Sequence, residues 1–490
     1  MRIRATFVLV LSAALAAPAT AAPADRSKPP AIGSPRALKL PPVQKLALTN
    51  GLPVILVEMR EVPAIEMQLV VKAGAASDPL NRTGLAAMTA EMLDEASGAR
   101  DALAIADALE LVGAELRTSC TWDATTVRLH VPAARFGAAL ATFSDVAMRP
   151  AFRQKDLDRV RREALTDLLQ ARDEPRRLAS FALNRAVFGE GHRYGLPLTG
   201  DAASLAALRI GDLRNFHNKQ FRPENAAIVV VGATDAATLL PLLEKAFGAW
   251  QKGGTPAPQA GDAAQTAGRQ VLIVDRPGSA QSAIRIGRVG PSRATPDYHA
   301  LEVLNTLLGG SFTSRLNDNL RERHGYSYGA SSRFDYRRAV GLFVAASDVF
   351  TPVTADALRE FMSELVRIRT PAKKEEIERA RGYLAAGYAQ DFETTRQIAS
   401  KLAEQFAFGL LDDEFTSFVP KVMNVDAKLV QRAAGASIDT GNLAIVIVGD
   451  RAKIEKAVSA LDLGPVNVLS VDQLMGPPPK IDGPAKPEGD

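Results

Sequence analysis

An internal repeat places the strongest constraint on how this 490-residue chain can fold. Residues 225–232 and 442–449 are both apolar runs that begin with asparagine and end at glycine. Residues 158–179 match residues 378–399 at a constant offset of 220, without gaps. Because the repeated unit is far longer than the roughly 20–50 residues of solenoid repeats, the repeat predicts two homologous domains of about 200 residues each.

Both strand and helix patterns occur within the first half. Residues 46–58 alternate between apolar and polar around Asn50-Gly51, and residues 114–130 alternate in the same way, as hairpins do. Residues 133–148 have helical spacing, and so do residues 156–186, where Pro175 breaks the pattern. We therefore predict an α+β fold made of two homologous α/β-sandwich domains that are related by internal duplication.

Composition and the repeat together give expected boundaries. The first half should end near Trp250, because residues 251–268 have the glycine, proline and alanine content of a linker. The segments predicted are a signal peptide at 1–21, a Pro-rich linker at 22–44, an N-terminal domain at 45–250, a linker at 251–268, a C-terminal domain at 269–467 and a disordered tail at 468–490.

The first 21 residues have the pattern of a secretory signal peptide. Arg2 and Arg4 precede an apolar run at 7–17, and Ala19-Thr-Ala21 provides a small-x-small cleavage site. The apolar run is shorter than the ~20 residues that span a membrane, and no later segment is long and apolar enough to do so. We expect export to the periplasm and no membrane association after cleavage.

Charge and cysteine content exclude several classes of function. Removal of the signal peptide leaves 57 basic and 55 acidic residues, and no basic stripe with interleaved aromatic residues indicates nucleic-acid binding. The single cysteine, Cys120, allows no internal disulfide, and we interpret it as a small buried apolar residue. Neither a phosphate-binding P-loop nor a G-x-S-x-G nucleophile elbow is present.

Residues 81–98 are the stretch that bears most directly on function. Leu85 and Met88 begin an apolar stripe at helical spacing, and Asn81 or Thr83 can cap the start of the helix. The other face carries Ala87, Ala90 and Glu91 where an H-x-x-E-H zinc helix would place its first histidine, its glutamate and its second histidine. The stretch therefore predicts a helix at the position of a zinc helix but without the side chains that bind the metal and activate water.

Several motifs make the chain resemble the pitrilysin/insulinase (inverzincin) family of metallopeptidases over about residues 45–465. These motifs are Leu48-Thr-Asn-Gly-Leu-Pro-Val54, Gly84-Leu-Ala86, Phe221-Arg-Pro-Glu-Asn225, Leu308-Gly-Gly-Ser-Phe-Thr-Ser-Arg-Leu316 and Arg321-Glu-Arg-His-Gly-Tyr-Ser-Tyr328. The resemblance implies two similar α+β halves that face each other around a chamber which holds peptide.

The metal motif departs from the family pattern. By resemblance, the first histidine falls on Ala87, the glutamate on Ala90 and the second histidine on Glu91. The distal glutamate ligand falls at Asp167, with Glu163 the other acid nearby. Since a site of this kind needs three protein ligands, we expect no zinc or other cofactor in this chain and no catalytic residue.

Arg321 and Tyr328 are retained. In the family, an arginine and a tyrosine seven residues apart reach from the second half to the carbonyl of the bound peptide. The resemblance therefore implies a substrate-binding role for this pair, since both side chains can donate to a carbonyl oxygen. The alternative is structural, with Arg321 on a helix surface and Tyr328 in the core.

Three functional hypotheses follow. The first is an inactive peptidase homologue that binds peptide and serves as the non-catalytic subunit of a heterodimeric periplasmic metallopeptidase. Its partner would be a family member with an intact His-x-x-Glu-His motif, which would hold the zinc. The second is a periplasmic homodimer that binds peptides as a chaperone does. The third is an active metallopeptidase whose site is remodelled around Glu91, Asp167 and a histidine distant in the sequence.

Overall fold

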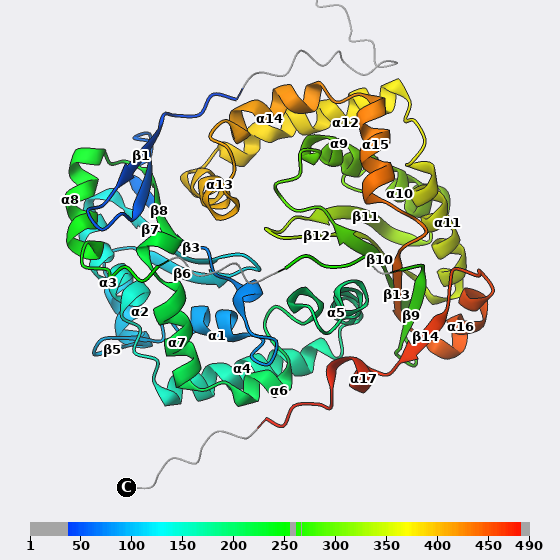
Figure 1. Ribbon diagram of the computed structural model, residues 1–490, viewed down its shortest axis with the longest axis horizontal. Helices are drawn as coiled ribbons and strands as arrows, with labels where there is room; N and C mark the ends of the chain where they lie inside the picture. Colours follow the sequence, from blue (N-terminus) through cyan, green and yellow to red (C-terminus); the bar gives the residue numbers. More distant parts are fainter. Residues whose placement is uncertain (1–37, 255–260, 266, 482–490) are drawn as a thin grey trace, which may run out of the picture. The chain divides into compact units, whose positions relative to one another are not determined.

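Two mixed six-stranded sheets organise the protein (Figure 1). The computed structural model describes residues 38–254, 261–265 and 267–481. The predicted signal peptide, most of the 22–44 linker and the end of the predicted tail lie outside the described residues, as does part of the 251–268 linker. No helix in the described ranges is both long enough and apolar enough to cross a bilayer.

The first sheet belongs to the N-terminal half, and its strand order is β1-β2-β8-β3-β7-β6. Only β2 and β8 pair in parallel in this sheet. The strands are β1 (Val43–Ala47), β2 (Pro53–Glu58), β3 (Ala64–Val71), β6 (Glu115–Cys120), β7 (Thr125–Pro132) and β8 (Ala226–Gly232), with a separate pair formed by β4 (Ala96–Ser97) and β5 (Arg100–Asp101).

The second sheet belongs to the C-terminal half, and its order is β11-β12-β10-β13-β9-β14. When the second sheet is read from β14 to β11, its strands from β9 onward run in the same relative directions as the strands of the first sheet from β2 onward. The first strand differs, because β14 runs parallel to β9 whereas β1 runs antiparallel to β2. The strands are β9 (Gln270–Asp275), β10 (Gln281–Gly290), β11 (Ser327–Asp335), β12 (Gly341–Phe350), β13 (Ala444–Gly449) and β14 (Val466–Leu469). The prediction of two homologous α/β-sandwich domains is confirmed.

The two matched apolar runs are the central strands β8 and β13. Every residue of both strands is buried, because each sheet is covered on both faces. In β8, Ile228 and Val230 face one apolar cluster while Val229 and Val231 face another. This two-sided burial explains why the runs are continuously apolar rather than alternating.

Most helices cover one face of the sheet in their own half. In the N-terminal half these are α1 (Leu85–Glu91), α2 (Ala102–Glu110), α3 (Phe136–Met148), α4 (Gln154–Ala171), α6 (Ala202–Ala207), α7 (Ile210–Gln220) and α8 (Ala236–Phe247). In the C-terminal half they are α9 (Tyr298–Leu308), α10 (Arg315–Asn317), η5 (Asp318–Arg323), α11 (Thr354–Arg367), α12 (Lys374–Gly387), α14 (Glu414–Met423), α15 (Ala427–Ser437) and α16 (Arg451–Ser459).

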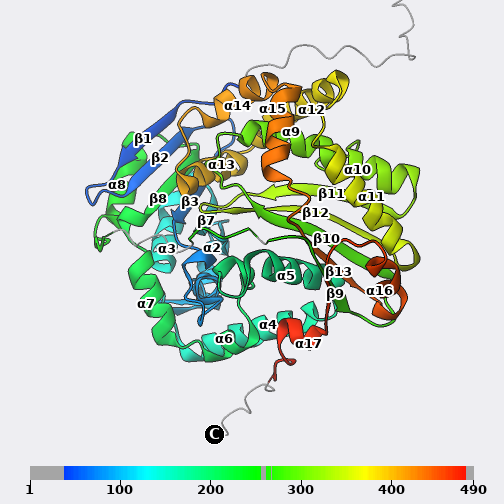
Figure 2. The same ribbon diagram turned by 45° about the vertical axis from the view of Figure 1, so that its right-hand side comes forward.

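The remaining face of each sheet is covered by a helix from the other half. Helix α5 (Pro175–Phe188) packs on β10 and β13, and α13 (Thr395–Phe408) packs on β3 and β8 (Figures 1 and 2). Their ranges differ by 220 residues at both ends, so the offset of the sequence match continues through this pair of exchanged helices.

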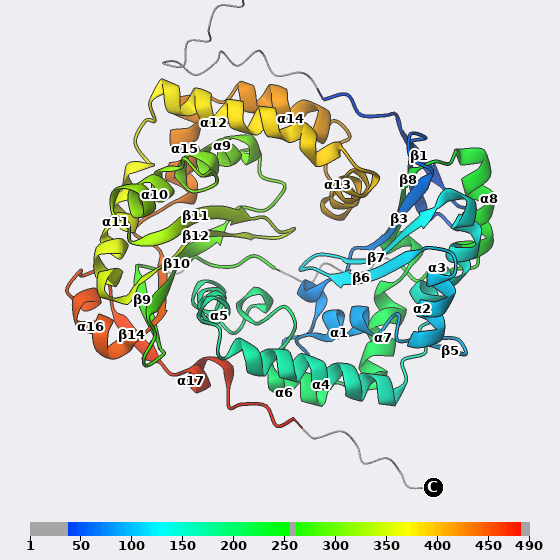
Figure 3. The ribbon, with the colours of Figure 1, turned by 180° about the vertical axis from the view of Figure 1, so that it is seen from behind.

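The C-terminal segment also joins the two halves. After β14, the helix α17 (Val471–Met475) and residues 476–481 lie against α5 and the N-terminal half (Figure 3). Arg172 forms an ion pair with Asp472 and donates to the carbonyl oxygen of Gly476 at 2.7 Å. Residues 468–481 therefore differ from the disordered tail expected at 468–490.

Helix α1 is held at its start by a buried ion pair rather than by Asn81 or Thr83. The Asp78 carboxylate accepts from the backbone N–H groups of Gly84 at 2.9 Å and Ala86 at 2.8 Å, and from Arg193 at 2.9 Å. Burial raises the pKa of Asp78 to about 6, although Arg193 and the N–H donors oppose the rise. Gly84 has φ = +83°, and a Cβ there would collide with the Thr199 carbonyl, so only glycine fits.

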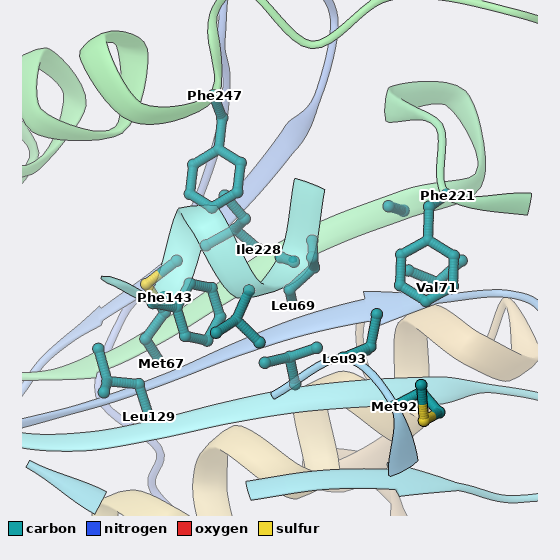
Figure 4. Close-up of a cluster of buried hydrophobic side chains, with 14 of the residues drawn as sticks. Met67, Leu69, Val71, Met92, Leu93, Leu129, Phe143, Phe221, Ile228 and Phe247 are labelled. Carbon is teal, nitrogen blue, oxygen red and sulfur yellow. The ribbon is translucent and has the colours of Figure 1, made fainter. Parts of the chain in front are cut away.

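Immediately after α1 the chain enters the core. Met92 and Leu93 are fully buried with Met67 and Leu69 of β3, as the close-up in Figure 4 shows. The helix therefore ends at Glu91, and Gly98 has φ = +58° in the turn between β4 and β5. Cys120 ends β6 as a half-buried residue, and burial raises the pKa of its thiol to about 12, which makes it unreactive.

We predict that Arg193→Met destabilises the protein by roughly 3–5 kcal/mol, because Asp78 would remain buried without its cationic partner. Arg193 also donates to the carbonyl oxygens of Pro197 and Leu198, which would lose their donor. Chemical denaturation checks the change. Arg149→Met is the control, since Arg149 pairs with Asp145 on the surface and its loss should change little. Equal effects of the two substitutions would contradict this role for Arg193.

Candidate functional site

The three motif positions on α1 differ in their exposure. Ala87 is half-buried and Glu91 is exposed at the end of the helix, whereas Ala90 is only 1% exposed. Alanine offers no atom that can bind a metal or accept a proton. The position of the expected general base is therefore part of the apolar core.

Glu91 lies within a group of acidic residues. Partial burial raises the pKa of Glu91, and repulsion from Glu95 and Glu163 adds to the rise. Arg159 on α4 balances these neighbours, since it forms an ion pair with Glu95 and another with Glu163 at 2.7 Å. A guanidinium group thus supplies the positive charge in this group of carboxylates.

Asp167 has a different partner. It lies one turn beyond Glu163 on α4, and its carboxylate oxygens accept from both terminal nitrogens of Arg177, at 2.9 and 2.6 Å. This bidentate geometry is the strong form of an arginine–carboxylate pair. The structure thus brings Glu163, rather than Asp167, into electrostatic contact with Glu91.

These residues do not fit a zinc ion. A zinc site of the expected kind needs three protein ligands, and two of the four motif positions are alanines. Among the described residues, no three His, Cys, Asp or Glu side chains are close enough to hold a metal together. The nearby carboxylates of Glu163 and Asp167 already bind arginine.

Arg321 lies on η5, a six-residue π-helix of the C-terminal half. Its guanidinium group stacks over the ring of Phe312, 4.5 Å from the ring centre, and its Nε lies 3.5 Å from the carboxylate of Glu322. Phe312 is 64% exposed. The side chain of Arg321 is thus oriented by an exposed aromatic ring while its head group stays partly open to solvent.

Tyr328 is not a core residue, because it is 83% exposed. It lies at the start of β11, where the pairing with β12 shifts between Ser327 and Ala330 as in a β-bulge. Its ring meets that of Phe350 edge to face at 6.3 Å. No hydrogen bond to its hydroxyl is found among the described residues, so the hydroxyl is free to donate to a ligand.

Asn317 joins the segments that carry these aromatic residues. Its side-chain amide donates to the carbonyl oxygen of Phe312 at 2.7 Å, and its side-chain oxygen accepts from the backbone of Ala330 at 3.2 Å. Gly309 fits closely against β11, where a Cβ would lie 2.2 Å from the backbone nitrogen of Ser332. The Gly309-Gly310 motif therefore permits the loop to pack on the strand that presents Tyr328.

An open cavity of about 460 Å³ links Tyr328 with α5. It lies between α5 and strands β10–β12, and Gly329, the neighbour of Tyr328, lines it. Arg177 also lines it, and Arg177 is the partner of Asp167. The partner of Asp167 and the chain neighbour of Tyr328 thus line the same cavity.

A second cavity, of about 520 Å³, lies beside the edge strand β6. Arg117, Ser119 and Thr121 line it from successive outward positions of β6 and the residue that follows, and Ser400 and Glu404 line it from α13. Within the described part of the chain, strand β6 pairs with β7 alone, so its other edge has unpaired backbone groups. Helix α1 packs against this same strand.

Sequence reasoning identified Glu91, Arg321 and Tyr328 but missed the arginines around them. Arg177 and Arg159 belong to no recognisable motif, and their ion pairs depend on how α4 and α5 pack, which the sequence does not show. The repeat did contain a signal for α5, since its match with α13 marks two helices that play the same part in the fold.

Two family models match consecutive parts of the chain. The model described as "Insulinase (Peptidase family M16)" matches residues 54–201, and the model described as "Peptidase M16 inactive domain" matches residues 207–384. The first match covers α1 and Asp167, and the second covers Arg321 and Tyr328. The matched regions thus contain both parts of the candidate site.

Relatives and solved structures agree with these matches. An uncharacterized zinc protease of Mycobacterium leprae is 25% identical over 74% of this chain and 81% of its own length. The structure of a peptidase M16 inactive domain from Pseudomonas fluorescens superposes with a TM-score of 0.79 at 25% identity, covering 83% of this chain and 98% of that one. A chain of complex III from Candida albicans shares the fold, with a TM-score of 0.73 at 15% identity over 85% of this chain and 99% of that one. The chain belongs to the insulinase family, peptidase family M16.

Proposed function

We propose that this protein is a peptide-binding, catalytically inactive member of its family that serves as the non-catalytic subunit of a heterodimeric periplasmic metallopeptidase. One observation carries the proposal: the motif positions on α1 are Ala87, Ala90 and Glu91, while Arg321 and Tyr328 remain solvent-accessible. The chain thus lacks the groups for hydrolysis and keeps those suited to holding a peptide carbonyl.

Peptide binding is supported by the free edge of β6. An extended peptide can add to such an edge as a further strand, with backbone hydrogen bonds that do not depend on its sequence. The cavity beside β6 offers room for side chains of a bound strand, since alternate side chains of a strand point to the same face. Because α1 packs on β6, a peptide bound there would run beside the degenerate helix.

Arg321 and Tyr328 would act on the peptide backbone. Each offers a donor to a carbonyl oxygen, and a charged donor gives the stronger hydrogen bond. In a heterodimer, these donors would support a peptide whose scissile carbonyl is polarised by zinc in the partner. This chain would then contribute binding and orientation, and the partner the hydrolytic chemistry.

A partner is needed because the residues on α1 do not fit zinc. The Candida albicans chain of similar fold is part of a complex, which supports assembly as a mode of action for this fold. The partner we propose is a family member with an intact His-x-x-Glu-His motif. The pattern of residues 1–21 supports the periplasm as the place of action, and N-terminal sequencing of the protein from a periplasmic fraction tests cleavage after Ala21 or Ala22.

We predict that the purified chain contains far less than one zinc ion per molecule and does not cut peptides. Peptidase activity that a chelator abolishes should appear when the catalytic partner is added. Elemental analysis and a fluorogenic peptide assay, with each chain alone and both together, measure this. Chelator-sensitive cleavage by this chain alone would refute the proposal. A stable homodimer that binds peptide and does not associate with the partner would favour the chaperone-like alternative.

Substitutions of the retained pair should impair the assembled enzyme. Arg321→Ala should lower kcat/KM of the complex by about 10²-fold, the effect of removing one preorganised donor to a reacting carbonyl. Tyr328→Phe removes only the hydroxyl and should lower kcat/KM in the same direction without affecting folding, since Tyr328 is exposed.

Arg323→Ala is the matched control for Arg321→Ala. Arg323 lies on the same helix but forms an ion pair with Asp318, so its loss should leave turnover unchanged. If Arg321→Ala and Tyr328→Phe retain full turnover in the complex, the pair has no role in binding the substrate carbonyl.

A further inference from the structure

We propose that the arginine-lined cavity between α5 and strands β10–β12 is a subsite for an acidic side chain of the bound peptide. This inference rests on the proposed peptide-binding function and adds a substrate class to it. The preferred peptides would carry aspartate or glutamate close to the residue whose carbonyl Tyr328 contacts.

Four arginines and one aspartate line this cavity. Arg176 and Arg177 come from the first turn of α5, Arg285 from β10 and Arg333 from β11, and the acid is Asp348 of β12. Helix α5 and the two strands β10 and β11 thus direct positive charge toward one space, and β12 contributes the acid.

The negative charges present do not balance these arginines. Asp348 accepts from Arg285 at 3.1 Å and also pairs with Arg176. Asp167 neutralises Arg177. Glu174 also lies within ion-pair distance of Arg177, at 3.8 Å. Arg333 has no ion pair among the described residues, so the four arginines exceed their three acidic partners by one positive charge.

Arg285 shows the effect of this excess. Its side chain is only 12% exposed. Burial is the main cause that lowers the pKa of Arg285, and repulsion from Arg176 and Arg333 acts in the same direction, against the attraction of Asp348. An added carboxylate would relieve that repulsion, because it would stabilise the charged form of all three guanidinium groups.

The place of the cavity determines which ligand reaches it. Gly329 lines it and is bonded to Tyr328, and consecutive Cα atoms are only about 3.8 Å apart. A peptide held at Tyr328 would therefore place a neighbouring side chain at the cavity mouth. Carboxylates form bidentate hydrogen bonds with guanidinium groups, which neutral side chains cannot match in strength.

Binding of a peptide series to the full-length chain tests the inference. The series has amidated C-termini and a neutral glutamine sequence in which one glutamine at a time is replaced by glutamate. We expect the best glutamate peptide to bind about tenfold more tightly than the neutral parent at low salt, as one charge-assisted contact predicts. The ratio should fall at high salt, because the cavity is open and ions screen the charges.

Arg333→Gln should reduce this ratio to about threefold or less, while binding of the neutral parent stays the same. The substitution should not affect folding, since Arg333 is exposed. Arg176→Gln, which is also exposed, gives a second test at the same cavity. Arg359→Gln is the control, because Arg359 pairs with Asp356 on α11 and does not line the cavity, so the ratio should be retained.

Equal affinities for the acidic and neutral peptides would overturn the inference and leave the proposed peptide binding intact. Absence of binding to every peptide would instead refute the proposed function. The neutral parent is also measured with a free C-terminal carboxylate. Tighter binding of that peptide, without a gain for any glutamate peptide, would show that the cavity takes the end of a chain, and would overturn the assignment to an acidic side chain.

Discussion

The reciprocal exchange of helices α5 and α13 is the constraint on which the rest of this structure depends. The central strands β8 and β13 are apolar on both faces, so each sheet needs a cover on its second face. In each half that cover comes from the other half. Neither half could expose its uncovered sheet to water without a large hydrophobic cost, and the two halves therefore stabilise each other.

The exchange also builds the candidate site. Because α5 follows α4 after a break at Pro175, the helix that carries Glu163 and Asp167 continues directly into the helix that covers the C-terminal sheet. Arg177, in the first turn of α5, reaches back to Asp167 and forward to the cavity beside Gly329. Arg276, after β9, fixes this junction through hydrogen bonds to Arg172 and Asp173.

The sequence was sufficient for the parts of the fold that depend on periodicity and repetition. The apolar runs, the break at Pro175 and the offset of 220 predicted the two halves and their main elements, and the structure confirms two homologous domains. The sequence did not reveal that α5 and α13 change places, because an amphipathic helix pattern shows which face is buried but not against which sheet. It also did not reveal that Asp78 holds α1, since its partner Arg193 lies 115 residues away.

At the candidate site, the motif positions come from the sequence and the charge balance around them comes from the structure. The sequence spacing singles out Ala87, Ala90 and Glu91 on α1, and the structure shows which arginines balance the carboxylates around them. Carboxylates grouped without a cation repel one another, and their charge must be balanced or their pKa values must rise. Here Arg159 binds Glu95 and Glu163, and Arg177 binds Asp167, while the pKa of Glu91, which has no such partner among the described residues, is raised. Arginine is always charged and has fixed donors, so it can stabilise this arrangement permanently where a metal would bind reversibly. The region around α1 and α4 is therefore organised around internal ion pairs between arginine and carboxylate side chains.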